Sequence, residues 1–169
     1  GQVAGPLADF TLTHTFRYSK ETNPHIIEAL YRFPLPGDAA VTEVEVTFGE
    51  VTIHSRLKAR KEAVTDYENA KKENRAAALV TRESPDVFTL RIAGIAPDED
   101  VIIRTRYVQI GQPQGTGFSF RVPLTTSPRY VRSDEQYSRH ANGQPLAVLR
   151  DPGHRFSLSV TEGGSGTMK

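Results

Sequence analysis

Residues 41–57, VTEVEVTFGEVTIHSRL, alternate between apolar and polar side chains on both sides of a Gly-Glu turn. In an extended chain Val44, Val46 and Phe48 would share one face, and the acidic residues and threonines between them would share the other. Because only two residues separate the two alternating runs, the stretch predicts an antiparallel β-hairpin. A hairpin with one apolar face needs a second layer of structure to cover that face.

The same period of two recurs in both directions along the chain. Residues typical of turns, such as ETNP, APDED and GQPQGTG, separate the alternating runs. This organisation predicts a mostly β domain, built as an antiparallel β-sandwich. Besides the hairpin, the predicted strands are residues 10–18, 27–33, 86–95, 101–110, 118–124, 146–149 and 155–160.

One segment departs from this period. Within residues 60–77, Ala63, Tyr67 and Ala70 have the spacing of a single helical face. We therefore expect one α-helix, over about residues 60–77, that crosses the sandwich with Tyr67 as its anchor. A buried tyrosine hydroxyl needs a hydrogen-bond partner. The helix should fray near Asn74, because asparagine tolerates the left-handed backbone conformation that ends many helices.

Prolines end two of the predicted strands. The stretch YRFPLP at residues 31–36 and the stretch RVPL at residues 121–124 each place proline after an aromatic run. Proline has no backbone N–H to donate to a sheet. Pro34, Pro36 and Pro123 could therefore protect the edges of the sandwich from pairing with other chains. The alternative, that these prolines only set turn geometry, is equally open.

Length and charge limit the remaining possibilities. The chain has 169 residues, and we expect residues 1–160 to form one domain and the Gly/Ser-rich residues 161–169 to be a flexible tail or linker. Its 21 basic and 20 acidic residues give a net charge of +1, which provides no long-range attraction to nucleic acid or membranes. No run approaches the roughly 18 apolar residues of a membrane span, and no signal peptide is visible.

The residue types also argue against a reaction centre. The absence of cysteine excludes disulfides, thiolate zinc sites and a thiol nucleophile, and no Gly-x-Ser-x-Gly motif is present. We therefore predict no enzyme activity, no metal ligand and no cofactor. A hydrolase or self-processing domain centred on the histidines and Asp151 is the alternative, although LRDPGH at residues 149–154 is more typical of a turn. None of the histidines form a helical i, i+4 zinc pair; they are His14, His25, His54, His140 and His154.

Several motifs occur in a specific order. A Tyr-x-Phe-Pro-Leu-Pro strand end at residues 31–36 precedes the predicted helix, which contains Glu-Ala, a tyrosine and a further alanine. Pro-x-Val-Phe at residues 85–88, Gly-Ile-x-Pro at 94–97 and Pro-Arg-Tyr at 128–130 follow it. Over roughly residues 9–131 this order resembles the VIT domain, the vault/inter-alpha-trypsin-inhibitor domain.

The resemblance has departures and implications. Asn74 stands where the family often has glycine, and the similarity thins after Tyr130. The family implies a non-catalytic, β-rich interaction module that is usually followed by a von Willebrand factor type A domain. The Asp-x-Ser-x-Ser start of a type A domain is missing from this sequence. The resemblance therefore implies a fragment of a longer protein whose partner is an adjacent type A domain or another protein. The compartment stays open, with a secreted or cell-surface location favoured.

Two groups of side chains are candidates for partner binding. Tyr130 and Tyr137 lie in a polar, irregular stretch and would supply an aromatic patch. Arg104, Arg106 and Arg129 would form a basic stripe if neighbouring strands align them, and such a stripe could bind an acidic partner or an acidic glycan. The alternative is an ordinary solvated sheet face in which nearby acidic residues balance the arginines.

Overall fold

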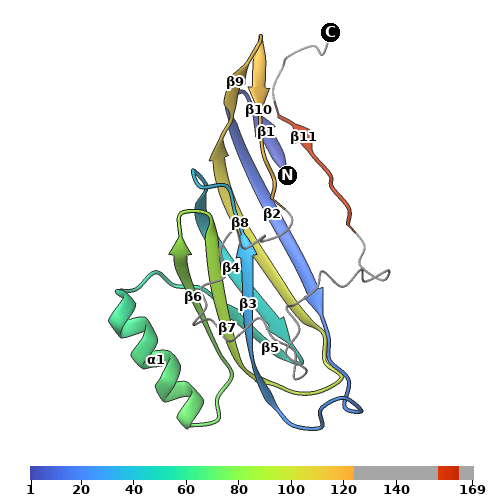
Figure 1. Cartoon of the computed structure of the whole chain (residues 1–169), viewed down its shortest axis with the longest axis vertical. Coiled ribbons are helices and arrows are strands. Elements are labelled where there is room, and N and C mark those ends of the chain that lie inside the picture. The colour runs from blue at the N-terminus through green and yellow to red at the C-terminus, as the bar shows by residue number, and fades with distance from the viewer. Residues whose placement is uncertain (124–155, 164–169) are drawn as a thin grey trace, which may run out of the picture.

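The computed structural model describes residues 1–123 and 156–163. Within them the chain forms two main β-sheets that pack face to face and a separate two-stranded hairpin, with one helix, α1 (Arg60–Lys72), on the outer face of the smaller main sheet (Figure 1). The mostly β, antiparallel sandwich with a single helix is confirmed. In the described part of the chain, no helix has the length and apolar character needed to cross a membrane.

The larger sheet has six strands in the order β11-β1-β2-β8-β4-β5. All its pairs are antiparallel except β1 with β11, which run parallel. Strand β11 uses the first two residues of the segment expected to be a tail. The bounds are β1 (Gln2–Ala4), β2 (Leu7–Phe16), β4 (Ala40–Phe48), β5 (Val51–His54), β8 (Val101–Ile110) and β11 (Thr161–Glu162).

The smaller sheet has three antiparallel strands, β3 (Ile27–Pro34), β7 (Val87–Ile95) and β6 (Ala77–Ser84), in the order β3-β7-β6. Pro34 is therefore the last residue of an edge strand within the described sheet. Pro36 instead opens a turn, in which its carbonyl oxygen accepts a hydrogen bond from the Ala39 N–H at 2.9 Å. A separate hairpin pairs β9 (Gln112–Gln114) with β10 (Gly117–Ser119).

The main core lies between the two sheets. Its centre is formed by fully buried side chains of β7 and β8, including Leu90, Ile92 and Ile103. The apolar face predicted for residues 44–48 points into this core. A second, smaller core joins the outer face of the smaller sheet to α1, where Tyr67 and Ala70 pack on β6 and β7.

The predicted hairpin is β4 and β5, but its second strand is shorter than expected. The side-chain hydroxyl of Ser55 accepts a hydrogen bond from the Val44 N–H at 2.9 Å, and the Ser55 N–H donates to the Val44 carbonyl at 2.9 Å. Strand β5 ends at His54, before this contact, and the chain then leaves the sheet. The alternation of residues 51–57 predicts that Leu57 shares the apolar face with Val51 and Ile53, and this prediction is wrong because the Leu57 side chain is 103% exposed.

Helix α1 begins where predicted but ends at Lys72, five residues before the expected end at residue 77. Asn74 has a φ of 53°, so the predicted left-handed residue is confirmed. Its N–H donates to the Lys71 carbonyl at 3.0 Å, and the Arg75 N–H donates to the Ala70 carbonyl at 2.9 Å. These two bonds define a Schellman motif, which stops the helix and redirects the chain into β6.

Candidate functional site

Two arginines of the predicted stripe lie on the outer face of the larger sheet, two residues apart on β8. Arg104 donates through Nη1 to Glu45 Oε1 of β4 at 2.5 Å. Arg106 forms a two-pronged contact with Asp9 of β2, with Nε to Oδ1 at 3.0 Å and Nη2 to Oδ2 at 2.6 Å. Each guanidinium is therefore paired with a carboxylate of a neighbouring strand, and the Arg106–Asp9 pair has the two-pronged geometry that arginine favours.

The surface around this pair is a polar groove of about 520 Å³ on the outer face of the larger sheet. The hydrogen bond and the positive charge of Arg106 lower the pKa of Asp9, although partial burial opposes them. Asp9, Glu43 and Glu45 line the groove together with Arg104 and Arg106. The groove thus presents both signs of charge to a ligand.

The other predicted binding residues, Arg129, Tyr130 and Tyr137, lie outside the described residues. Their alignment with Arg104 and Arg106 stays a prediction. The structure brings together only the two arginines of β8, because side chains two residues apart on a strand share one face.

Three potential metal-ligating side chains also meet on this face. The His54 Nδ1 atom is 3.5 Å from Glu45 Oε2 and 3.8 Å from Glu43 Oε1. A nitrogen and carboxylate oxygens are donors that divalent cations accept, but Arg104 already engages Glu45. The sequence analysis missed this cluster. The two-residue turn of the hairpin would have placed Glu45 directly opposite His54, as the register shows.

Two further histidines fall in the described residues. His14 lies on the inner face of β2, where its ring packs against Tyr31 with 5.4 Å between the ring centroids. Burial lowers its pKa, and its Nδ1 atom has no hydrogen-bond partner among the described residues. His25 lies in the loop before β3 and its carbonyl accepts the Tyr18 hydroxyl at 2.8 Å. His140, His154 and Asp151 lie outside the described residues.

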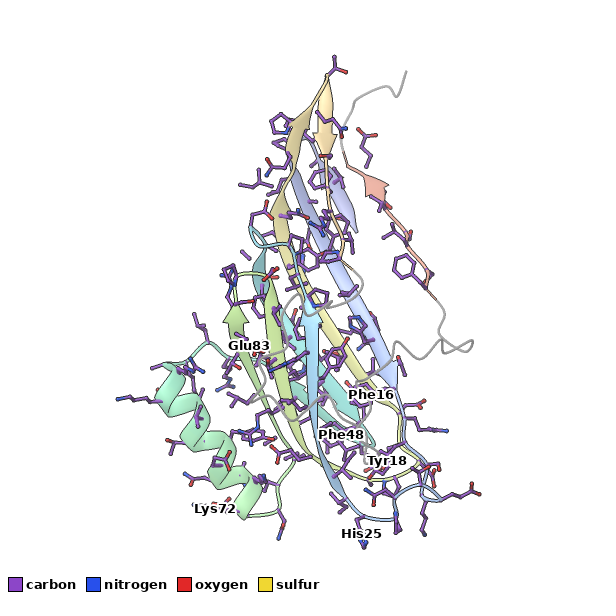
Figure 2. All side chains as sticks on the ribbon, viewed as in Figure 1. Phe16, Tyr18, His25, Phe48, Lys72 and Glu83 are labelled. Carbon is purple, nitrogen blue, oxygen red and sulfur yellow. The ribbon has the colours of Figure 1, made fainter. Side chains whose placement is uncertain are left out.

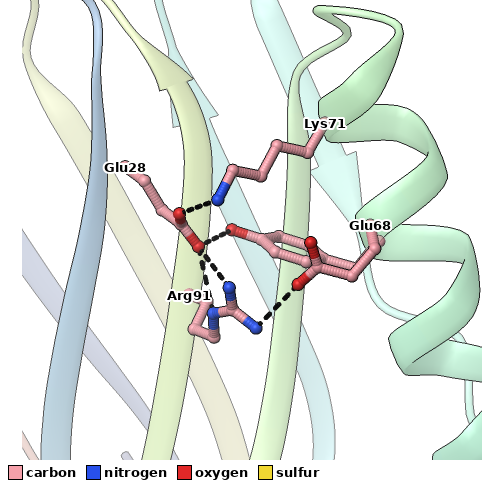
Figure 3. Close-up of polar contacts among 5 residues, drawn as sticks. Glu28, Glu68, Lys71 and Arg91 are labelled. Atoms are coloured by element: carbon pink, nitrogen blue, oxygen red, sulfur yellow. Dashed lines mark hydrogen bonds and ion pairs between the residues drawn. The ribbon is translucent and has the colours of Figure 1, made fainter.

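The densest polar cluster of the described chain fastens α1 to the smaller sheet (Figure 3). The carboxylate of Glu28, on β3, accepts hydrogen bonds from the Tyr67 hydroxyl at 2.7 Å, from Arg91 Nη2 at 2.7 Å, and from Lys71 Nζ. Arg91 also pairs with Glu68 of the helix at 3.1 Å, and its guanidinium lies 4.7 Å from the centre of the Tyr67 ring. We call these residues the Glu28 cluster.

Hydrogen bonds keep the Glu28 carboxylate ionised at neutral pH because they lower its pKa. Burial alone would raise the pKa of Glu28, but hydrogen bonds from Lys71, Tyr67 and Arg91 outweigh it and lower the pKa to about 2. Burial, followed by the bond to Glu28, raises the pKa of Tyr67. The carboxylate therefore acts as an acceptor that links β3, β7 and α1. The predicted need of Tyr67 for a partner is confirmed.

Comparison with known proteins relates this arrangement to a family. The family model for the Vault protein inter-alpha-trypsin domain matches residues 1–107, from β1 into β8. The chain is 31% identical over 128 residues to human protein mono-ADP-ribosyltransferase PARP4, which is 75% of this chain and 7% of that protein. It is 28% identical over 151 residues to rat von Willebrand factor A domain-containing protein 5A, which is 87% of this chain and 18% of that protein.

The chain thus spans less than a fifth of the length of the curated relatives it matches. The matched residues contain the smaller sheet, the larger sheet except β11 and the end of β8, the helix between β5 and β6, and every residue of the Glu28 cluster. The family model covers well over half of the chain. The chain therefore belongs to the VIT domain family, named for the vault protein inter-alpha-trypsin domain.

Proposed function

We propose that this VIT domain is a non-catalytic protein–protein interaction module of a longer protein, and that it packs against a neighbouring von Willebrand factor type A domain. The observation that carries the proposal is the alignment with von Willebrand factor A domain-containing protein 5A. That relative is named for a type A domain, and 87% of this chain aligns with 18% of its length. In such a protein the two domains share one polypeptide.

The similarity to the human transferase supports no transferase activity for this chain. The alignment covers 7% of that protein, and the ionisable side chains of the Glu28 cluster serve to hold a helix on a sheet. Charged residues that stabilise the fold in this way are consistent with a domain that offers a rigid surface for binding another protein.

Thermal unfolding tests the proposed function. The chain is compared alone and within the longer polypeptide that carries its type A neighbour. If the two domains pack, the VIT transition moves to higher temperature in the longer polypeptide, because a partner that binds only the folded state stabilises it. Two transitions at the same temperatures as those of the separate domains would contradict the proposal.

The tyrosines outside the described residues are proposed contacts of the same module. Replacing both Tyr130 and Tyr137 with alanine should weaken partner binding without changing the unfolding temperature of the isolated chain. Unchanged binding would remove both residues from the proposed interface.

A second candidate function is binding of an acidic glycan through Arg104 and Arg106, with Arg129 as a further proposed contact. The observation that favours it is their placement on one face, beside the polar groove. A ligand must displace the carboxylates of Glu45 and Asp9, so we expect weak and salt-sensitive retention on heparin. The variant R104Q/R106Q should then elute at lower salt. Equal elution of the two proteins would exclude this function.

A further inference from the structure

A second groove opens at one end of the sandwich, where β4 turns into β5 and β7 turns into β8. Its volume is about 560 Å³. The start of β3, the turn between β4 and β5, and the C-terminal end of α1 all contribute to it. Figure 2 places Lys72, the last residue of α1, and His25, which precedes β3, at this end of the molecule. We call it the end groove.

The end groove presents large apolar side chains to solvent. Ile26, in the loop just before β3 of the smaller sheet, is 70% exposed, and Val51, the first residue of β5 in the larger sheet, is 39% exposed. Phe48 is buried beneath them, and Ala76 and Ala93 line the wall next to the helix. Exposed apolar side chains that gather in a groove are typical of a binding surface.

The basic side chains of the end groove are paired with carboxylates, whereas two of its acidic side chains have no ion-pair partner in the described part of the chain. On the helix side Lys71 pairs with Glu28, and Arg75 pairs with Glu73 at 2.7 Å. On the opposite wall Glu50 and Glu99 form no ion pair with any residue between 1 and 123 or between 156 and 163.

The carboxylates of Glu50 and Glu99 belong to adjacent turns. The Glu99 carboxylate lies against the turn that contains Glu50, since a Cβ added to Gly49 would be 2.9 Å from Glu99 Oε1. Gly49 has a φ of +54°, which glycine adopts without strain. The end groove therefore combines an apolar floor with a negative wall.

We propose that the end groove docks a polypeptide segment of a partner protein in which an apolar side chain is flanked by lysine or arginine. The apolar side chain would cover Ile26 and Val51, and the basic residue would pair with Glu50 and Glu99. Charge complementarity selects this occupant, because an acidic segment would meet two carboxylates that have no counter-ion in the described part of the chain. The inference rests on the proposed function and assigns it a surface.

The test uses the whole 169-residue chain and two synthetic probes, acetyl-KLKLK-amide and acetyl-ELELE-amide, in a two-dimensional amide NMR titration. The basic probe should shift the amides of Ile26, Val51 and Gly94, and the shifts should shrink as salt rises. The acidic probe should leave these amides unchanged. No shift from the basic probe up to its solubility limit, or equal shifts from both probes, would overturn the proposal.

Matched variants distinguish binding in the end groove from a general effect of the net charge of the protein. E50Q/E99Q should weaken binding of the basic probe by about fivefold, in line with the loss of two exposed ion pairs. The control D38N/E162Q also removes two negative charges, but from exposed positions that do not line the groove. It should bind the basic probe as tightly as the unaltered chain does. Equal weakening in both variants would overturn the proposal.

The end-groove proposal and the proposed function can fail independently of each other. If the basic probe shifts only amides away from the end groove, the groove assignment fails. The thermal test with the type A neighbour can still succeed in that case, and the module would then use another surface. If the probe binds in the groove but the type A domain has no effect on unfolding, the docking surface stands and the proposed neighbour does not.

Discussion

Two buried tyrosines differ in what their hydroxyl groups contact. Tyr67, between α1 and the smaller sheet, donates to Glu28 at 2.7 Å. Tyr107, in the main core, has a hydroxyl with no hydrogen-bond partner among the described residues. A buried hydroxyl stabilises the fold when it is bonded and destabilises it when it is not. The sequence predicted that the Tyr67 hydroxyl has a hydrogen-bond partner, since a buried tyrosine needs one. It did not predict that the partner is Glu28, which lies 39 residues earlier in the chain.

Replacing each of these tyrosines with phenylalanine should give opposite results. Tyr67→Phe removes a bond to a charged acceptor and should lower the free energy of unfolding by about 1–3 kcal/mol. Tyr107→Phe removes a hydroxyl without a described partner and should leave the free energy unchanged or raise it. Urea unfolding followed by circular dichroism measures both. A larger loss in Tyr107→Phe than in Tyr67→Phe would contradict this assignment.

The lowered pKa of Glu28 predicts a specific loss of stability in acid. The pKa falls from 4.5 to about 2 on folding, so the folded state binds fewer protons than the unfolded state. Stability from this carboxylate is therefore complete above about pH 5 and is lost as the pH falls towards 2. After solvent screening we expect a loss of about 1–3 kcal/mol.

The isosteric variant Glu28→Gln supplies the control for this titration. It keeps an acceptor oxygen but has no proton to bind, so its unfolding free energy should fall less between pH 5 and pH 2 than that of the unaltered chain. Parallel pH profiles for the two proteins would show that Glu28 does not carry the effect.

At the scale of elements, local sequence patterns predicted which segments form strands or helix better than they predicted the residues at which those segments end. The turn at residues 49–50 fixed the register of β4 on β5. The sequence predicts a helix to about residue 77, and Ala76 and Ala77 have a high intrinsic preference for helix. In the structure Ala77 instead pairs with β7, so contacts between distant segments override the local preference. The pairing of β4 with β8 brings Arg104 to Glu45 across 59 positions, and no local pattern specifies that register.

The Schellman motif of α1 gives a test at this scale. Asn74→Gly should raise the free energy of unfolding by about 0.5–1 kcal/mol, because glycine adopts the left-handed conformation without strain, and Asn74→Ala should lower it by about 1 kcal/mol. The same change to glycine at Asn69, inside the helix, should lower stability by a few tenths of a kcal/mol. A gain in stability from glycine at Asn69 rather than at Asn74 would contradict the assigned helix end.

At the scale of the whole molecule, the order of motifs was informative because two of the motifs mark the ends of strands in the described part of the sandwich. The strand end at residues 31–36 closes β3, and Gly94 with the turn after it closes β7. The alternation of apolar and polar residues predicted the sandwich, and the order of motifs indicated the family. Neither could predict the end groove, since residues from β3, β7, α1 and two turns meet there only after folding. Glu50 and Glu99 are unremarkable until their turns are placed side by side.

Hydrogen–deuterium exchange compares the isolated chain with the same chain in the longer polypeptide that carries its type A neighbour, and it tests the role of an interaction module most directly. We predict slower exchange over one continuous surface of the VIT domain in the longer polypeptide, because docking shields amides from solvent and opposes local opening. Identical exchange at every amide of residues 1–123 and 156–163 would contradict the account.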